Sequence, residues 1–312
     1  MFMPLQPGGS DVYVGGDFTS IGGLNANRIA KWDGHSWSTL GSGIGNGIVY
    51  AIAVDGSVIY VGGTFTTAGG VNVSRIAKWD GRTWSVLAGG ISECNNPYCS
   101  PAVYAIEIHG SNIFVDGEFG RADKVSASGI AMWNGSNWFG LGGGIHSGTR
   151  DGIVMTLAVS GSDIYMGGKF SEAGGISARN IAKWSGNSWS GLGNGIRGDM
   201  ERVRAIGISG SEVYVGGGFN TAGEVAAHNV AKWNGRDWTA LTIEAGGEVW
   251  AITVSGREIY LGSSSFKIPG GKMARGIVKW NNGSWSALGE GMALPLISAI
   301  RASGCGIYVG GG

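Results

Sequence analysis

Charge is scarce in this chain, and the charges that are present cancel. Only 14% of the 312 residues are charged, and 22 lysines and arginines balance 22 aspartates and glutamates. Soluble domains average about a quarter charged residues. Such a balance leaves no basic surface for nucleic acid or for an anionic membrane, so we expect no nucleic-acid partner.

Long hydrophobic runs are absent as well. No apolar stretch approaches the roughly 18 residues of a membrane-spanning helix, so we expect no membrane span. The first ten residues, MFMPLQPGGS, lack the basic and then apolar pattern of a signal peptide. A processed chain would look the same, so this absence does not decide the compartment.

Catalytic motifs are also missing. The sequence has no Gly-x-Ser-x-Gly elbow, no His-Glu-x-x-His motif and no phosphate-binding loop. Its histidines show no clustered spacing: His35, His109, His146 and His228. We therefore expect no cofactor and no metal, and we assign no catalytic residue. Paired carboxylates for sugar hydrolysis stay open, because they can meet in three dimensions only.

Glycine (62 residues) and tryptophan (13 residues) are abundant, and both recur at fixed places. One marker is an apolar run that ends in small residues and then Phe. Its copies are VYVGGDF (Val12–Phe18), IYVGGTF (Ile59–Phe65), IFVDGEF (Ile113–Phe119), IYMGGKF (Ile164–Phe170), VYVGGGF (Val213–Phe219) and IYLGSSSF (Ile259–Phe266), with IYVGGG (Ile307–Gly312) at the end.

A second marker is a pair of tryptophans five residues apart around a turn. The pairs are Trp32/Trp37, Trp79/Trp84, Trp133/Trp138, Trp184/Trp189, Trp233/Trp238 and Trp280/Trp285. Large aromatic side chains dominate core energetics, so we expect these twelve residues to pack between neighbouring sheets. Only Trp250 lies outside the pattern.

Each repeat predicts four strands, A to D. In the second repeat they are Val49–Val54, Val58–Phe65, Arg75–Trp79 and Thr83–Leu87, with Asp-Gly turns between A and B and between C and D. A lone meander cannot bury both faces, so the repeats must stack. The sequence therefore predicts an all-β fold, a β-propeller of four-stranded antiparallel blades.

We favour seven blades in a single domain, 1–312. Their bounds are about 1–45, 46–95, 96–149, 150–199, 200–246 and 247–294, with a partial blade at 295–312. The good B strands at 12–18 and 307–312 cannot share one blade position, and Phe2–Ser10 aligns weakly with a strand A, where Pro4 fits poorly. The alternative is a six-bladed ring closed by a strand around Ile297–Ala302, with Phe2–Ser10 as a tail.

The order of strand A, then IYVGG, then a W-x-G-x-x-W hairpin resembles Kelch-type repeats. The phrase IYVGGTFTTAGGVNVSRIAKWDG is similar to two further groups: uncharacterised bacterial secreted propeller repeats and the propeller region of fungal cortical polarity-marker proteins. The resemblance covers nearly the whole chain. It implies a propeller that is often extracytoplasmic or surface-associated, and it carries no agreed catalytic residues.

The meander places the B–C and D–A loops on one face, and binding residues concentrate on such loops. Two D–A loops hold candidate ligand-binding residues. The loop Gly144–Gly152 carries His146, Arg150 and Asp151, which suit an anionic or sugar ligand or are simply solvated. The loop Gly195–Arg202 contains Arg197 and Asp199 in an Arg-Gly-Asp tripeptide, a short match that arises easily by chance.

A third D–A loop, Gly89–Pro101, contains Cys94 and Cys99, and four residues separate the two. We favour a disulfide, with free thiols or a metal site as the alternatives, and a disulfide indicates an oxidising compartment. Cys305 is left over, and we expect it to be a buried apolar residue.

These observations favour a non-enzymatic extracellular binding or scaffold propeller that uses the B–C/D–A loop face for a glycan or protein ligand. We expect it outside the cell or at the cell surface, with the periplasm as an alternative. Two other functions stay open. One is a carbohydrate hydrolase or lyase with its site on the propeller axis, and the other is a structural module of a larger repeat protein. The sequence gives no oligomeric state.

Overall fold

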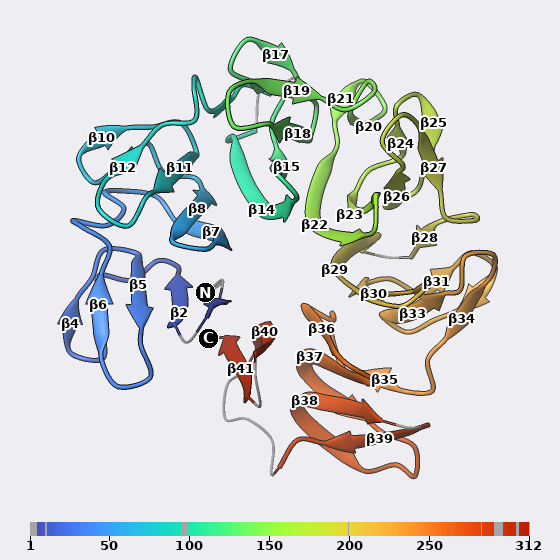
Figure 1. Ribbon diagram of the computed structural model, residues 1–312. Coiled ribbons are helices and arrows are strands. Elements are labelled where there is room, and N and C mark those ends of the chain that lie inside the picture. Colours follow the sequence, from blue (N-terminus) through green and yellow to red (C-terminus); the bar gives the residue numbers. More distant parts are fainter. Residues whose placement is uncertain are drawn as a thin grey trace. The chain divides into compact units, whose positions relative to one another are not determined.

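The computed structural model describes residues 5–9, 11–94, 99–198, 200–281, 283–289, 296–303 and 306–311, and every regular element in these ranges is a β-strand. The chain divides into two compact units, Met1–Val154 and Met155–Gly312. Each unit is a series of antiparallel sheets (Figure 1). The expectations for Phe2, Pro4 and Cys305 fall outside the described residues.

The first unit contains three four-stranded meanders, in each of which the strands follow the chain. Their strands are β1 (Leu5–Gly8), β2 (Asp11–Gly15), β5 (Ile29–Trp32) and β6 (Trp37–Thr39); β7 (Val49–Asp55), β8 (Val58–Gly63), β11 (Ile76–Trp79) and β12 (Trp84–Ser85); and β14 (Ala102–His109), β15 (Asn112–Glu118), β18 (Ile130–Trp133) and β19 (Trp138–Gly140).

The second unit repeats this arrangement and ends in a two-stranded sheet. Its strands are β22 (Ile153–Ser160, which begins in the first unit), β23 (Asp163–Lys169), β26 (Ile181–Trp184) and β27 (Trp189–Gly191); β29 (Arg202–Ser209), β30 (Glu212–Gly218), β33 (Val230–Trp233) and β34 (Trp238–Ala240); β36 (Ala251–Ser255), β37 (Glu258–Lys267), β38 (Met273–Asn281) and β39 (Ser284–Ala287); and β40 (Ile297–Ser303) with β41 (Gly306–Gly311).

These stacked meanders are propeller blades, so the predicted all-β class and the four-stranded blade are confirmed. The number of blades and their bounds stay predictions. Strand D is shorter than the sequence predicts: β12 stops at Ser85, because the chain then turns to place Leu87 in the core.

The B–C connections are more ordered than the sequence suggests. The segment Thr66–Ser74, predicted as a loop, contains a small hairpin, and so do its counterparts in four other repeats, whereas β37 and β38 pair directly in the sixth. The short strands are β3 (Ser20–Ile21), β4 (Leu24–Asn25), β9 (Thr67–Ala68), β10 (Val71–Asn72), β16 (Arg121–Ala122), β17 (Val125–Ser126), β24 (Glu172–Ala173), β25 (Ile176–Ser177), β31 (Thr221–Ala222) and β32 (Val225–Ala226).

The D–A connections also carry short strands, which are β13 (Ile91–Ser92), β20 (Ile145–Ser147), β21 (Arg150–Asp151), β28 (Ile196–Arg197) and β35 (Glu244–Ala245). β13 pairs with β16 and β28 pairs with β31, so each of these connections is hydrogen-bonded to the next B–C hairpin. The loop face is therefore a hydrogen-bonded surface rather than a set of free loops.

The core lies between successive sheets of each unit. In the first unit, Ile29 and Leu40 of one repeat pack with Val61 and Phe65 of the next. In the second unit, Ile181 and Leu192 pack in the same way with residues of the following repeat. Burying these apolar side chains is the main stabilising term for such a stack.

Glycines in strand B let the sheets approach closely. A side chain at Gly62 would meet the next sheet, because an added Cβ would lie 2.9 Å from the Cβ of Val103 and 3.1 Å from Cδ1 of Ile106. Gly15, Gly167, Gly216 and Gly262 face the first strand of the following sheet in the same manner. The glycines of IYVGG are thus required for the close packing of neighbouring sheets.

The tryptophan pairs have two environments, which corrects the expectation that all twelve are core residues. Five are buried and seven are half-buried. Each pair has its ring centroids 5.0–5.3 Å apart. The buried indole nitrogens of Trp84, Trp138 and Trp238 donate to leucine carbonyls of the preceding repeat, at 2.8–2.9 Å. These bonds connect neighbouring sheets.

We predict that Gly62→Ala destabilises the protein by about 1–3 kcal/mol, because the new methyl group overpacks the contact with Val103. Urea unfolding of the single variants and of the Gly62→Ala/Val103→Ala double variant measures this. The double variant should lose less than the sum of the two single losses, since the second change makes room for the first. Simple additivity would contradict the close approach.

Candidate functional site

A repeated tether holds the loop face in place. At the residue before strand C the backbone adopts positive φ, 62° at Arg28 and 69° at Asn229. The side chain of this residue then reaches the following D–A connection: Arg28 Nε donates to the Gly47 carbonyl (2.7 Å) and Asn229 Nδ2 to the Gly247 carbonyl (3.0 Å). Arg75 and Asn180 do the same to Pro101 and Ile196.

The third repeat lacks this tether because Gly129 occupies the position, with φ of 69°. There the Ser128 hydroxyl donates to Asp151 Oδ1 instead. Both side chains are buried. Asp151, which the sequence offers as a ligand-binding candidate, thus makes a hydrogen bond that connects its D–A loop to the preceding strand.

His146 lies beside this pair, and Arg150 does not. His146 and Asp151 are cross-strand partners in the β20–β21 hairpin. His146 Nε2 is 2.7 Å from the Gly143 carbonyl, and its Nδ1 is 3.4 Å from Ser128 Oγ. Arg150 is exposed. The structure therefore brings two of the three candidates of this loop together.

Ser128, His146 and Asp151 do not form a hydrolase-type triad. In a triad, the histidine lies between the serine and the acid. Here the serine donates directly to the acid, and the Ser128 side chain is buried. The geometry fits a structural connection better than nucleophilic catalysis.

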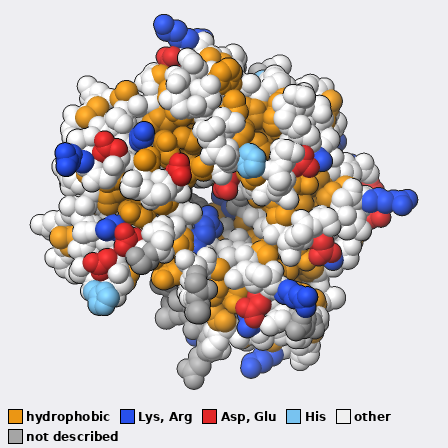
Figure 2. Space-filling model, in the orientation of Figure 1, with side chains coloured by type: hydrophobic (Ala, Val, Ile, Leu, Met, Phe, Trp, Pro, Cys, Tyr) orange, Lys and Arg blue, Asp and Glu red, His pale blue; other side chains and the backbone are white. Residues whose placement is uncertain are grey.

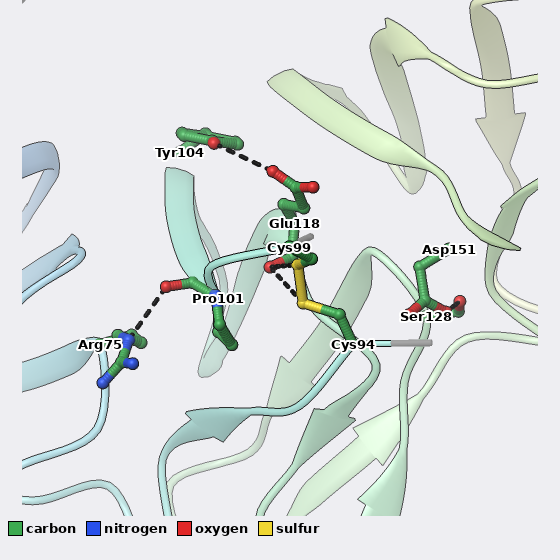
Figure 3. Close-up of a disulfide and its surroundings, with 8 residues drawn as sticks. All are labelled: Arg75, Cys94, Cys99, Pro101, Tyr104, Glu118, Ser128 and Asp151. Carbon is green, nitrogen blue, oxygen red and sulfur yellow. Dashed lines mark hydrogen bonds between the residues drawn. A yellow bond between two sulfur atoms is a disulfide. The ribbon is translucent and has the colours of Figure 1, made fainter. Parts of the chain in front are cut away.

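The predicted disulfide is present. Cys94 and Cys99 are joined, with their Cα atoms 6.2 Å apart. Figure 3 shows the two sulfur atoms beside the backbone of Glu118 at the end of β15. They lie 3.7 and 3.9 Å from the Glu118 carbonyl oxygen. The two sulfur atoms therefore lie against the strand end that carries this glutamate.

Two acids on β15 have unusual surroundings. The Tyr104 hydroxyl donates to Glu118 Oε2 at 3.5 Å (Figure 3). Burial raises the pKa of Glu118; the Tyr104 hydrogen bond opposes this rise and the negative charge of Asp151 adds to it. Asp116 is fully buried, and no side chain among the described residues donates a hydrogen bond to its carboxyl group; the backbone of Ala105 opposes the effect of burial on its pKa only in part. Burial holds the pKa of Asp116 well above its usual range.

The remaining D–A candidates are not brought together as a site. Arg197 is half-buried on β28, and its Nε has no hydrogen-bond partner among the residues that the structure describes. Asp199 lies outside the described residues. The Arg-Gly-Asp match therefore gains no geometric support.

A polar cluster in the second unit was missed from the sequence. Glu248 accepts hydrogen bonds from Arg202 and Arg204, with 2.6 Å between Arg204 Nε and Glu248 Oε2. The Arg204 guanidinium carbon lies 3.8 Å from the centroid of the Trp250 ring, a cation–π contact. The sequence signal was Trp250 itself, the one tryptophan outside the pairs.

A shared backbone feature was also missed. Strand A carries a β-bulge near its start, where the register of the ladder shifts by one residue. Bulges redirect side chains. The bulge residues in the two units are Tyr50, Tyr104, Arg204 and Ser298, and Trp250 directly precedes its own strand at the matching place in the repeat.

On the face shown in Figure 2, charged side chains of both signs are scattered singly or in small groups. Among the described residues, no group of three or more His, Cys, Asp or Glu side chains is arranged to hold a metal ion. No helix that is long and apolar enough to cross a membrane occurs in the described part of the chain.

Comparison with known proteins agrees with the fold. No family model matches the sequence, and no curated protein matches it. Among solved structures, the WD40 β-propeller domain of Doa1 superposes with a TM-score of 0.59 at 12% identity, over 99% of this chain and 88% of that one. The computationally designed Ika8 protein gives 0.53 at 13% identity, over 99% and 93%.

A third similar structure is the extracellular domain of BT4673 from B. thetaiotaomicron, described as a one-component system. It has a TM-score of 0.59 at 11% identity over 98% of this chain. This chain spans 36% of that domain's length. At these identities the similarity establishes the propeller fold and nothing further.

We predict that Asp116→Asn stabilises the protein by about 1–3 kcal/mol at neutral pH, because folding forces this buried carboxyl either to take up a proton or to stay charged without a side-chain partner. Since burial raises the pKa of Asp116 in the folded state, the wild-type protein loses stability as the pH rises above the unfolded value of about 4. The gain of the variant should therefore grow with pH. Denaturant unfolding at several pH values checks this, with exposed Asp55→Asn as the control. A gain that is the same at every pH would contradict the assignment.

We predict that Glu248→Gln destabilises the protein by about 1–3 kcal/mol at neutral pH, because two partly buried arginines lose their shared carboxylate. Burial alone raises the pKa of Glu248, but Arg202 and Arg204 outweigh it and the pKa lies below its usual range. This stabilisation is complete above the unfolded pKa and is lost as the pH falls through the folded one. The wild type and the variant should thus converge in acid, which urea unfolding near neutral and at low pH measures.

Proposed function

We propose that this chain is a non-enzymatic extracellular binding or scaffold propeller that contacts a glycan or protein through its B–C/D–A loop face. The Cys94–Cys99 disulfide supports a location in an oxidising compartment. The similar extracellular domain from B. thetaiotaomicron is consistent with this location. The proposed location includes the cell surface.

The observation that carries the proposal is the contrast between constant and variable positions of the repeat. Strand B glycines, core leucines and paired tryptophans recur because they pack the sheets together. The bulge position of strand A instead holds Tyr50, Tyr104, Arg204 or Ser298, and Trp250 stands at the matching place. Tyrosine, tryptophan and arginine are the residues that dominate binding interfaces. A rigid frame with such side chains at its variable position is typical of a recognition surface.

The resemblance to Kelch-type repeats, secreted bacterial propeller repeats and fungal polarity-marker propellers supports the same proposal. The six W-x-G-x-x-W hairpins and the IYVGG strands are its basis. We further propose a single propeller of seven blades, with the bounds given above.

The hydrolase alternative depends on a pair of carboxylates, and Glu118 with Asp151 is the candidate pair. Burial does raise the pKa of Glu118, as in a general acid. Asp151, however, is buried and accepts from Ser128, and Glu118 accepts from Tyr104. Both carboxylates are thus engaged by protein side chains, which favours binding over catalysis.

We expect a glycan or peptide array to yield a ligand whose binding drops at least about tenfold in Tyr104→Ala or Trp250→Ala, since truncated aromatic contacts commonly cost this much. Phe139→Ala is the matched control, because Phe139 is an exposed aromatic residue (43%) on the outer strand β19. A ligand lost only in the control would place the interface elsewhere. Turnover of the bound glycan would show that the protein is an enzyme.

A further inference from the structure

We infer that Tyr50, Tyr104 and Glu118 form a binding site for a cationic nitrogen group, an ammonium or a guanidinium, carried by the ligand of the loop face. The inference rests on the proposed function and names the chemistry that the site selects. A lysine or arginine side chain and an amino sugar both carry such a group.

The two tyrosines form the aromatic part of the site. They are the bulge residues of β7 and β14, the first strands of two neighbouring sheets. Their ring centroids are 5.5 Å apart and their planes are inclined by 51°. Both side chains are half-buried, so each ring retains surface that a ligand can reach. A cation over such rings is attracted by their quadrupoles when it lies within about 6 Å of the centroid.

Glu118 supplies the counter-charge. It ends strand β15, where it pairs across the sheet with Ala102, and its carboxylate is directed toward the Tyr104 hydroxyl (Figure 3). The disulfide that packs against its carbonyl fixes the backbone beneath it. The carboxylate is half-buried. An incoming cation therefore meets an acid that water solvates only in part.

Carboxylates act electrostatically on both Tyr50 and Glu118. Burial and the charge of Asp17 raise the pKa of Tyr50. The charge of Asp151 likewise raises the pKa of Glu118. Asp116 lies two residues before Glu118, on the same side of β15, but burial holds its pKa well above its usual range and favours its neutral form. His146 lies beside Asp151 across the β20–β21 hairpin.

The nearby arginines are engaged with backbone carbonyls or with other carboxylates. Arg28 donates to the carbonyls of Gly47 and Ile44 and lies 3.9 Å from Asp17. Arg75 donates to the Pro101 carbonyl. Arg121 lies 3.6 Å from Glu93. None of these arginines makes an ion pair with Glu118 among the described residues.

This balance selects a cation over the alternatives. An anionic ligand would be repelled by Asp17, Glu118 and Asp151. A neutral sugar would contact the tyrosine rings but would not offset the burial of the Glu118 carboxylate. A cation contacts the rings and also offsets the burial of the carboxylate. By linkage, its binding lowers the pKa of Glu118. Affinity should accordingly rise with pH as Glu118 ionises.

The experiment compares charged probes with their neutralised counterparts on the whole chain. Nα-acetyl-lysine methylamide is paired with its Nε-acetylated form, and a glucosamine trimer is paired with its N-acetylated form. Ring-labelled tyrosine NMR follows Tyr50 and Tyr104. We expect at least one charged probe to bind about tenfold more tightly than its neutral counterpart. The lysine and amino-sugar pairs distinguish the two sources of the cation.

Three variants test the roles of the side chains. Glu118→Gln should reduce binding of the charged probe about tenfold and abolish its pH dependence. Tyr104→Phe keeps the ring and should retain most of the binding, whereas Tyr104→Ala should lose it. Asp55→Asn removes an exposed acid from the turn at the far end of β7 and should change nothing. Thermal unfolding of each variant confirms that it is folded.

Several outcomes would overturn the inference: equal binding of charged and neutral probes, full binding by Glu118→Gln, or no shift of either tyrosine with any probe. The cation site can also be refuted while the proposed function holds. If a ligand from the arrays is lost in Tyr104→Ala but is indifferent to Glu118→Gln and to N-acetylation, the loop face binds ligands and the cation site is refuted.

Discussion

The close approach of one sheet to the next is the constraint on which the rest of this structure depends. A four-stranded meander has two faces and cannot bury either alone, so each sheet must lie flat against its neighbour. Gly62 allows this, because a Cβ there would meet Val103 of the following sheet. The indole nitrogen of Trp138 then donates to the Leu87 carbonyl of the preceding repeat and connects the same two sheets at their outer edge.

This constraint explains why so little of the repeat is free to carry function. Strand B must keep its small residues, and strands C and D must keep the hairpin of paired tryptophans. The start of strand A is different, because a bulge there lifts one residue out of the ladder. Its side chain differs from repeat to repeat, as Tyr50, Tyr104, Arg204 and Ser298 show. Tyr50 and Tyr104 occupy this position in adjacent sheets.

The loops, too, contain residues whose role is structural. Polar residues that look like ligand-binding candidates can instead hold the frame together, as Asp151 does when it accepts from Ser128 where Gly129 leaves no tether. The disulfide packs beneath Glu118 and stabilises the strand end on which the proposed cation site depends. The loop face thus carries both structural residues and proposed binding residues, and their position in the repeat distinguishes the two.

The sequence by itself determined the all-β class, the four-stranded blade and the disulfide partners. These features depend on local spacing: alternating strands, Asp-Gly turns, paired tryptophans and two nearby cysteines. Only the tertiary structure decided which side chains meet. Tyr50 and Tyr104 share the motif Val-Tyr-Ala-Ile, at 49–52 and 103–106, but nothing in that motif indicates that their rings lie side by side. The contact of Glu248 with Arg204 likewise follows from packing between repeats. Each bulge residue is followed by Ala-Ile, so a sequence signal for this position was present. Which of these side chains come together emerges only when the sheets are stacked.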